Sequence, residues 1–134
     1  MKRIVLLAIL PLVTTPVSSD VNASELSYTC EILNAYSLRD DGSLEKSGWN
    51  DLFHGSKFTV SRLDGQIIGQ VLPTRLARRT FIVSKGNDKW SFRAAAEFKN
   101  DIQIIEVQEF KPSTEKPFQA WSSSGAGIVT GVCE

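Results

Sequence analysis

The chain contains one histidine, His54, which is the only side chain suited to act as a conventional general base near neutral pH. Asp51 and Ser56 lie close to it in the sequence and could complete a hydrolytic group. No motif marks a reactive serine, because the run 122–125 lacks the first glycine of a G-x-S-x-G nucleophile elbow. We therefore predict that His54 is an ordinary loop residue and that the protein is not an enzyme, with a hydrolase as a minor alternative.

Metal and cofactor sites are not predicted either. Zinc sites need several clustered cysteines and histidines, and this chain has one histidine and two cysteines. The segment Asp40-Asp41-Gly42 lacks the acidic spacing and the final glutamate of a calcium-binding loop. The glycines do not follow the spacing of a phosphate-binding or dinucleotide-binding loop. We expect no metal ion and no cofactor.

Three arginines form the only local concentration of charge: Arg75, Arg78 and Arg79. Guanidinium groups this close together could hold a carboxylate or a phosphate through paired hydrogen bonds, or they could belong to a solvated loop between two strands. Trp49 is a candidate aromatic anchor, since tryptophan and arginine often dominate the binding energy of protein interfaces. If the protein has a partner-binding surface, these four residues are its first candidates.

The first 23 residues have the organisation of a secretory signal peptide. Lys2-Arg3 precedes an apolar run from Ile4 to Val13, and small and polar residues continue to Ala23. The apolar run is half of the about 20 residues that cross a bilayer, so a transmembrane anchor is the weaker alternative. We expect cleavage after Ala23, or after Ser19, and a single mature domain of residues 24–134 in the periplasm or outside the cell.

Export would give the two cysteines a role, because disulfides persist in oxidising compartments. Cys30 and Cys133 allow a single intramolecular pairing, and no C-x-x-C spacing favours a metal-binding or catalytic thiol. The bridge would close most of the mature chain into one loop, which contributes about 4–5 kcal/mol in the chain-entropy model. We therefore predict a structural disulfide between them.

The charge balance limits the kinds of partner. Removal of Lys2, Arg3 and Asp20 with the leader changes 15 basic and 15 acidic residues to 13 and 14. A mature chain so close to neutrality gives no reason to expect nucleic acid or an anionic membrane as a partner.

The mature chain alternates short apolar runs with turn residues, a pattern typical of all-β proteins. Trp90, Phe92, Ala94 and Ala96 alternate with polar residues and predict a strand with one buried face. Asp64-Gly65 separates two strand-like runs and predicts a hairpin. The predicted strands comprise residues 28–36, 57–63, 66–72, 80–84, 90–96, 102–110, 118–122 and 128–133.

Helix is expected to be scarce, with short helical turns at 49–54 and at 73–79. Ile104 and Ile105 interrupt the alternation of their strand and suggest a bulge or burial on both faces. Trp121, like Trp90, is expected to pack in the core or against strands.

Seven or eight antiparallel strands fit a small barrel or a two-sheet sandwich. We favour the barrel, because hairpin connections dominate and a disulfide would place the terminal strands side by side.

The segment from Phe58 to Gly69 follows the pattern F-x-V-x-R-x-x-G-x-I-x-G. It resembles a segment of small exported bacterial proteins of unknown function, whose mature part also begins with a cysteine-bearing strand, as at Cys30 here. The resemblance implies a bacterial exported β domain and no particular activity.

Tyr28-x-Cys30 and Ser124-Gly125-x-Gly127 are also similar to segments of periplasmic inhibitors of C-type lysozyme, which are small disulfide-bonded barrels. In those inhibitors the Ser-Gly segment lies in mid-chain, whereas here it lies beside the last cysteine.

Taken together, these features predict an exported, non-enzymatic binding module. Its partner would be another envelope or extracellular protein, as for an inhibitor, an immunity protein or an envelope accessory factor. The alternative is a lipocalin-like carrier with a small apolar ligand inside the barrel, since eight-stranded barrels can hold one such ligand.

Overall fold

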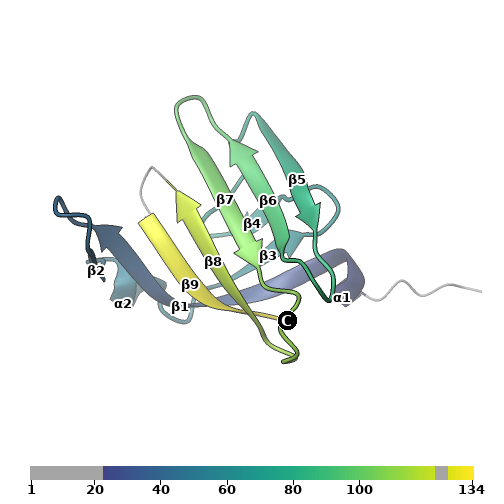
Figure 1. Cartoon of the computed structure of the whole chain (residues 1–134). Helices are drawn as coiled ribbons and strands as arrows, with labels where there is room; N and C mark the ends of the chain where they lie inside the picture. Colours follow the sequence, from purple (N-terminus) through teal and green to yellow (C-terminus); the bar gives the residue numbers. More distant parts are fainter. Residues whose placement is uncertain (1–22, 123–126) are drawn as a thin grey trace, which may run out of the picture.

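The computed structural model describes residues 23–122 and 127–134 of the chain (Figure 1). Apart from Ala23, the predicted leader lies outside these residues, as does the stretch 123–126 with its Ser-Gly segment. None of the helices in the described part is long and apolar enough to cross a membrane. The helices and strands of this part are α1 (Ala23–Leu26), β1 (Ser27–Leu38), β2 (Leu44–Lys46), α2 (Asn50–Phe53), β3 (Lys57–Ser61), β4 (Ile67–Gly69), β5 (Arg79–Lys85), β6 (Phe92–Glu97), β7 (Ile102–Val107), β8 (Lys116–Ser122) and β9 (Gly127–Cys133).

The strands of the described residues form one antiparallel sheet in the order β4-β3-β1-β9-β8-β7-β6-β5, with β2 paired to the end of β1. The sheet curls into a half-barrel, and its two edge strands, β4 and β5, are not paired with each other (Figure 1). The predicted all-β class and antiparallel arrangement are confirmed. A single curled sheet corresponds to the barrel alternative and not to the two-sheet sandwich, but this barrel is open on one side.

The concave face of the sheet holds the hydrophobic core. The curl brings the two halves of the sheet together, since the ring of Tyr28 on β1 lies 5.1 Å from that of Phe92 on β6. The rings of Phe58 on β3 and Phe118 on β8 lie 5.3 Å apart, and both pairs meet edge to face, an arrangement that aromatic rings favour. The largest fully buried side chains are Phe92, Ile32, Ile105, Val60, Val107 and Val129.

Strand β6 confirms the predicted burial of Phe92, Ala94 and Ala96. The predicted wet face is confirmed only in part, because Arg93 is exposed whereas Ser91 and Ala95 are buried. The prediction is wrong for Trp90, whose side chain is 66% exposed. Trp90 lies in the turn before β6, where its backbone N–H donates a hydrogen bond to the side chain of Asn87. The regular pleat that would turn its ring toward the core begins only at Phe92.

Strand β7 pairs with both neighbours without a register shift, so the predicted bulge at Ile104-Ile105 is wrong. Ile105 is buried, whereas Ile104 is 39% exposed, so the alternative of burial on both faces is wrong as well. Ile104 lies on the convex face opposite Trp121 of β8, whose side chain is 43% exposed and lies outside the core. The alternation of apolar and polar residues is interrupted in the sequence because Gln103, two residues before Ile105 on the same inward face, is polar. The buried Gln103 side chain donates a hydrogen bond of 2.8 Å to the carbonyl oxygen of Leu72.

Strands β3 and β4 form the hairpin predicted from Asp64-Gly65, and residues 62–66 connect them. Gly65 has a φ of 76° and lies against β6. A Cβ atom on Gly65 would lie 2.8 Å from the Cβ of Ala94, so the close approach of hairpin and sheet requires glycine.

The two predicted helical turns have different outcomes. The turn at 49–54 is confirmed as α2. The predicted helix at 73–79 is wrong, because residues 73–78 form a loop and Arg79 already belongs to β5. Strand β4 also ends at Gly69, before the predicted Leu72, because the chain turns there into this loop.

The disulfide joins Cys30 of β1 to Cys133 of β9, as predicted. The two residues face each other in the β1–β9 pair, and both side chains are fully buried. Thr29 and Glu134 exchange two backbone hydrogen bonds of 2.9 Å and continue the pairing beyond the bridge. The first and last strands therefore lie side by side, in the middle of the sheet and away from its open edges.

Replacing both cysteines by alanine should lower the free energy of unfolding by about 2–5 kcal/mol, because the unfolded chain regains the freedom that the bridge removes. Urea denaturation followed by tryptophan fluorescence measures the change. A reducing agent should weaken the natural protein to the same extent and leave the double variant unaffected. A loss below about 1 kcal/mol would contradict a structural role for the bridge.

Candidate functional site

The segment of residues 70–78 crosses the open side of the half-barrel from β4 to β5. Thr74 fixes this segment to β4 through its hydroxyl group. The backbone N–H of Ile67 donates a hydrogen bond of 2.8 Å to the Thr74 hydroxyl oxygen, and that hydroxyl donates to the Ile67 carbonyl oxygen at 3.3 Å. The backbone N–H of Arg78 donates to the carbonyl oxygen of Glu97 at 2.7 Å. Together with the bond from Gln103 to Leu72, these contacts tie both ends and the middle of the loop to the sheet.

The loop has an inner and an outer set of side chains. Val71, Leu72 and Thr74 are buried, whereas Arg75 and Leu76 are exposed. Leu72 has a φ of 60°, a left-handed conformation that costs a branched residue about 1–2 kcal/mol and persists only where surrounding contacts enforce it. The buried set therefore holds a fixed backbone from which the outer set projects.

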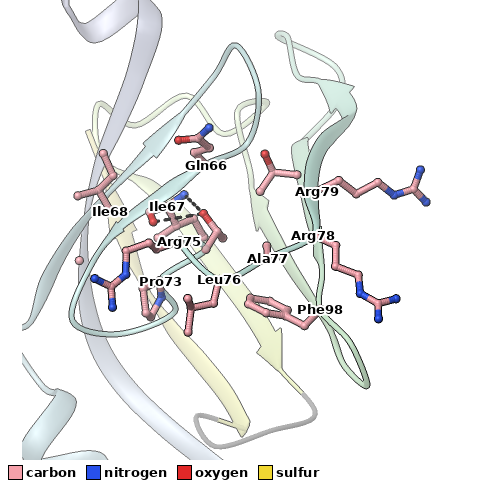
Figure 2. A pocket seen from close by; sticks show the side chains of 13 residues that line it. Gln66, Ile67, Ile68, Pro73, Arg75, Leu76, Ala77, Arg78, Arg79 and Phe98 are labelled. Atoms are coloured by element: carbon pink, nitrogen blue, oxygen red, sulfur yellow. Dashed lines mark hydrogen bonds between the residues drawn. The ribbon is translucent and has the colours of Figure 1, made fainter.

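The outer set lines a groove of about 820 Å³ between β4, the loop and the beginning of β5 (Figure 2). We call it the arginine groove. Its lining includes Ile68, Pro73, Arg75, Leu76, Arg78 and Phe98.

The three predicted arginines all line this groove, but their side chains do not converge on one point. In Figure 2, Arg75 points to one side and Arg78 and Arg79 point to the other, with Leu76 and Phe98 between them. Arg79 forms an ion pair of 2.6 Å with Glu97. Arg75 and Arg78 have no ion pair with any described residue. The geometry therefore offers two separate cationic positions on either side of an apolar floor.

The fourth predicted residue, Trp49, lies in a second hollow of about 440 Å³, which we call the tryptophan hollow. Trp49 is 56% exposed and stacks on Phe53, with ring centres 6.2 Å apart and planes inclined by 15°. Pro73 and Phe98 line both the tryptophan hollow and the arginine groove. The structure thus places all four predicted residues in two adjacent depressions that share one ridge.

Sequence reasoning missed the apolar part of this surface. Leu76 is 80% exposed between two arginines, and Ile68 and Phe98 lie beside it around the groove. The signal for Leu76 was present, because it lies among the arginines that were selected from the sequence, Arg75 and Arg78. Ile68 and Phe98 carried no such signal, since each follows an ordinary strand pattern.

Core side chains pack together on the concave face of the half-barrel. The space bordered by Gly65, Ala94 and Ile105 is too small for a water molecule. An apolar ligand held inside a lipocalin-like barrel therefore gains no support from the packing.

The surroundings of His54 offer no catalytic arrangement among residues 23–122 and 127–134. Its Nδ1 donates to the carbonyl oxygen of Leu33 at 2.8 Å, and the ring makes no hydrogen bond to Asp51 or Ser56. No group of three or more potential metal ligands occurs in the same part of the chain.

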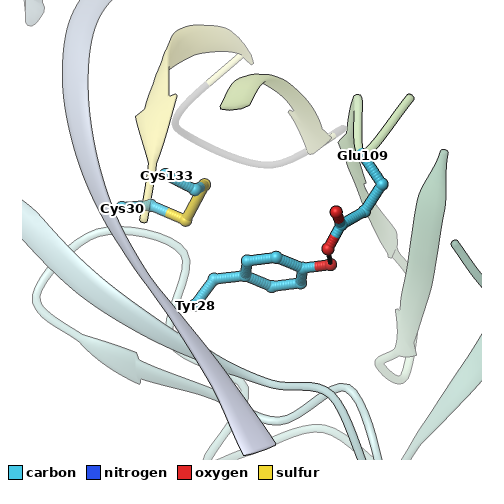
Figure 3. The surroundings of a disulfide bond; sticks show 4 residues. All are labelled: Tyr28, Cys30, Glu109 and Cys133. Carbon is cyan, nitrogen blue, oxygen red and sulfur yellow. Dashed lines mark hydrogen bonds between the residues drawn. A yellow bond between two sulfur atoms is a disulfide. The ribbon is translucent and has the colours of Figure 1, made fainter. Parts of the chain in front are cut away.

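A cluster of polar side chains that the sequence did not predict lies near the Cys30–Cys133 disulfide (Figure 3). The hydroxyl of Tyr28 donates to the carboxylate of Glu109, near the buried disulfide. Arg62 pairs with the same Glu109 oxygen at 3.2 Å, and its guanidinium lies 4.7 Å from the centre of the Tyr28 ring. Burial, and then the bond to Glu109, raise the pKa of Tyr28 well above its ordinary value of 10.0. The protonated phenol of Tyr28 therefore connects β1 with the residues after β3 and after β7 that carry Arg62 and Glu109, and it does not act as a base.

Comparisons with protein-family models, with curated proteins and with solved structures found no match to this chain. The arginine groove and the tryptophan hollow are therefore the features from which a function can be inferred. They combine exposed apolar side chains, a fixed backbone and two arginines that form no ion pair with any residue of 23–122 and 127–134.

Thr74→Val should lower the free energy of unfolding by about 1–3 kcal/mol, because the buried N–H of Ile67 loses its acceptor. Amide hydrogen exchange should also accelerate across residues 70–78 while the core strands stay protected. Thr29→Val is the matched control, since Thr29 is exposed and no hydrogen bond of its hydroxyl is lost. Equal effects of the two substitutions would contradict the anchoring role of Thr74.

Tyr28 should stay protonated well above pH 10 in the folded protein. Because the folded pKa is raised, its stabilising effect is complete below pH 10 and is lost as the pH rises above that value. In a Tyr36→Phe background, Tyr28 is the only tyrosine of the described residues. Its phenolate absorbance should then appear together with alkaline unfolding. Phenolate formation near pH 10 in a protein that is still folded would contradict this account, and Glu109→Gln should shift the titration toward that value.

Proposed function

We propose that the protein is an exported, non-enzymatic binding module that holds part of another envelope or extracellular protein against the arginine groove. The observation that carries this proposal is the exposed apolar surface of the groove, where Leu76 is 80% and Ile68 is 73% exposed beside a loop backbone fixed by buried hydrogen bonds. Folding gains nothing from that exposure, and exposed apolar patches mark interaction sites in soluble proteins.

The rigidity of the loop supports a binding role. Binding costs the freedom of every side chain and segment that becomes ordered, so a surface fixed in advance binds more tightly for the same contacts. Loops held by a rigid sheet are where proteins commonly place their binding residues. Arg75, Arg78 and Trp49, on the same surface, belong to the residue types that dominate interface energies.

The disulfide supports the exported location, because such bridges persist in oxidising compartments. The location in the periplasm or outside the cell, and the bacterial origin implied by the resemblance of the segment from Phe58 to Gly69, belong to the proposal. The packed core on the concave face favours a protein partner over a ligand enclosed by the barrel. The setting of His54 favours binding over hydrolysis.

Site-specific photo-crosslinking tests the proposal. A photoreactive amino acid at position 76 should give one discrete adduct in cells that naturally produce the protein. The same amino acid at position 38 is the control, because Leu38 is 70% exposed at the end of β1 and lines neither hollow. Arg78→Glu should reduce the adduct formed from position 76. Identical adducts from both positions, or no adduct from position 76, would overturn the proposal.

A further inference from the structure

The electrostatics of the arginine groove restrict what can bind there. Three arginines line it, and no carboxylate does so in the described part of the chain. Arg79 is paired with Glu97, whereas Arg75 and Arg78 form no ion pair within the part of the chain that the structure describes. A neutral partner that covered them would remove them from water without replacing their hydrogen bonds, and burial of an unpaired charge is strongly unfavourable. A bound partner therefore has to bring acidic groups.

The apolar surface restricts the partner further. Leu76 and Phe98 lie between the two cationic positions, and Ile68 lines the groove on the side of Arg75 (Figure 2). The ridge of Pro73 and Phe98 leads directly into the tryptophan hollow. A polyphosphate or nucleic acid would leave these side chains without apolar contacts, and the near-neutral net charge of the chain gives no reason to expect a wider basic surface for its other phosphates. A polypeptide can present acidic and apolar side chains together.

We propose that the partner binds through an extended acidic segment that carries a large apolar residue. Its carboxylates pair with Arg75 and Arg78, and its apolar side chain enters the tryptophan hollow against Trp49. This inference rests on the proposed function and specifies the partner chemistry of the same site. Paired hydrogen bonds between guanidinium and carboxylate groups would fix the direction of the segment, and the apolar contact would supply most of the buried area.

Selection of peptides by the protein itself tests this chemistry. A phage library of random linear peptides is selected on the immobilised natural protein and, in parallel, on the charge-reversed variant R75E/R78E. The matched control is K85E/K89E, which reverses two exposed cations near the opposite end of β5 and changes the net charge equally. Leu76→Asp reports whether a selected peptide uses the groove at all.

The natural protein and K85E/K89E should select peptides in which aspartate or glutamate flanks an aromatic residue or leucine. Those peptides should bind R75E/R78E at least about tenfold more weakly, and R75E/R78E should select lysine and arginine instead. Peptides that depend on Leu76 but bind R75E/R78E unchanged would overturn the acidic partner and leave the groove as the binding site. Peptides that are insensitive to Leu76→Asp, or no selected peptides, would count against the proposed function as well.

Discussion

The pairing of β1 with β9 is the constraint on which the rest of the structure depends. It joins the first and last strands of the described domain, and the buried Cys30–Cys133 bridge makes that contact covalent. Strand β1 then carries β3 and β4 on its other side, while β9 leads through β8, β7 and β6 to β5. The two ends of the sheet consequently belong to the middle of the chain, and the curl brings them toward each other (Figure 1).

The candidate site is a direct result of that arrangement. In a closed barrel, β4 and β5 would pair and leave no gap between them. Here the segment 70–78 connects them, with Thr74 occupying the backbone groups of Ile67 that a neighbouring strand would otherwise use. The loop thereby pairs the outward backbone groups of Ile67 on β4 and also exposes Leu76 with its neighbouring arginines. An unpaired sheet edge is a risk for aggregation, and the loop lowers that risk at Ile67 of β4 while it presents side chains for binding.

Much of the fold follows from local sequence patterns. Alternation in β6, the Asp64-Gly65 hairpin and the cysteine pair each depend on interactions that the sequence displays directly. The errors have a different origin. Gln103 points inward because a distant carbonyl, that of Leu72, accepts its hydrogen bond. The loop at 73–78 replaces a helix because of contacts with β4 and β6, which no local pattern reveals. The arginines could be selected from the sequence, whereas their separation across an apolar floor depends on tertiary structure.

The most direct test of the central claim, that the face around the segment 70–78 is the binding surface, is nuclear magnetic resonance mapping. The labelled protein is titrated with the peptide from the partner region that crosslinks to position 76. We predict that amide shifts concentrate in residues 66–80 and at Phe98 and Trp49, with little change on the convex face near Trp121. Shifts centred on Trp121 and Ile104, with the segment 70–78 unaffected, would contradict the account.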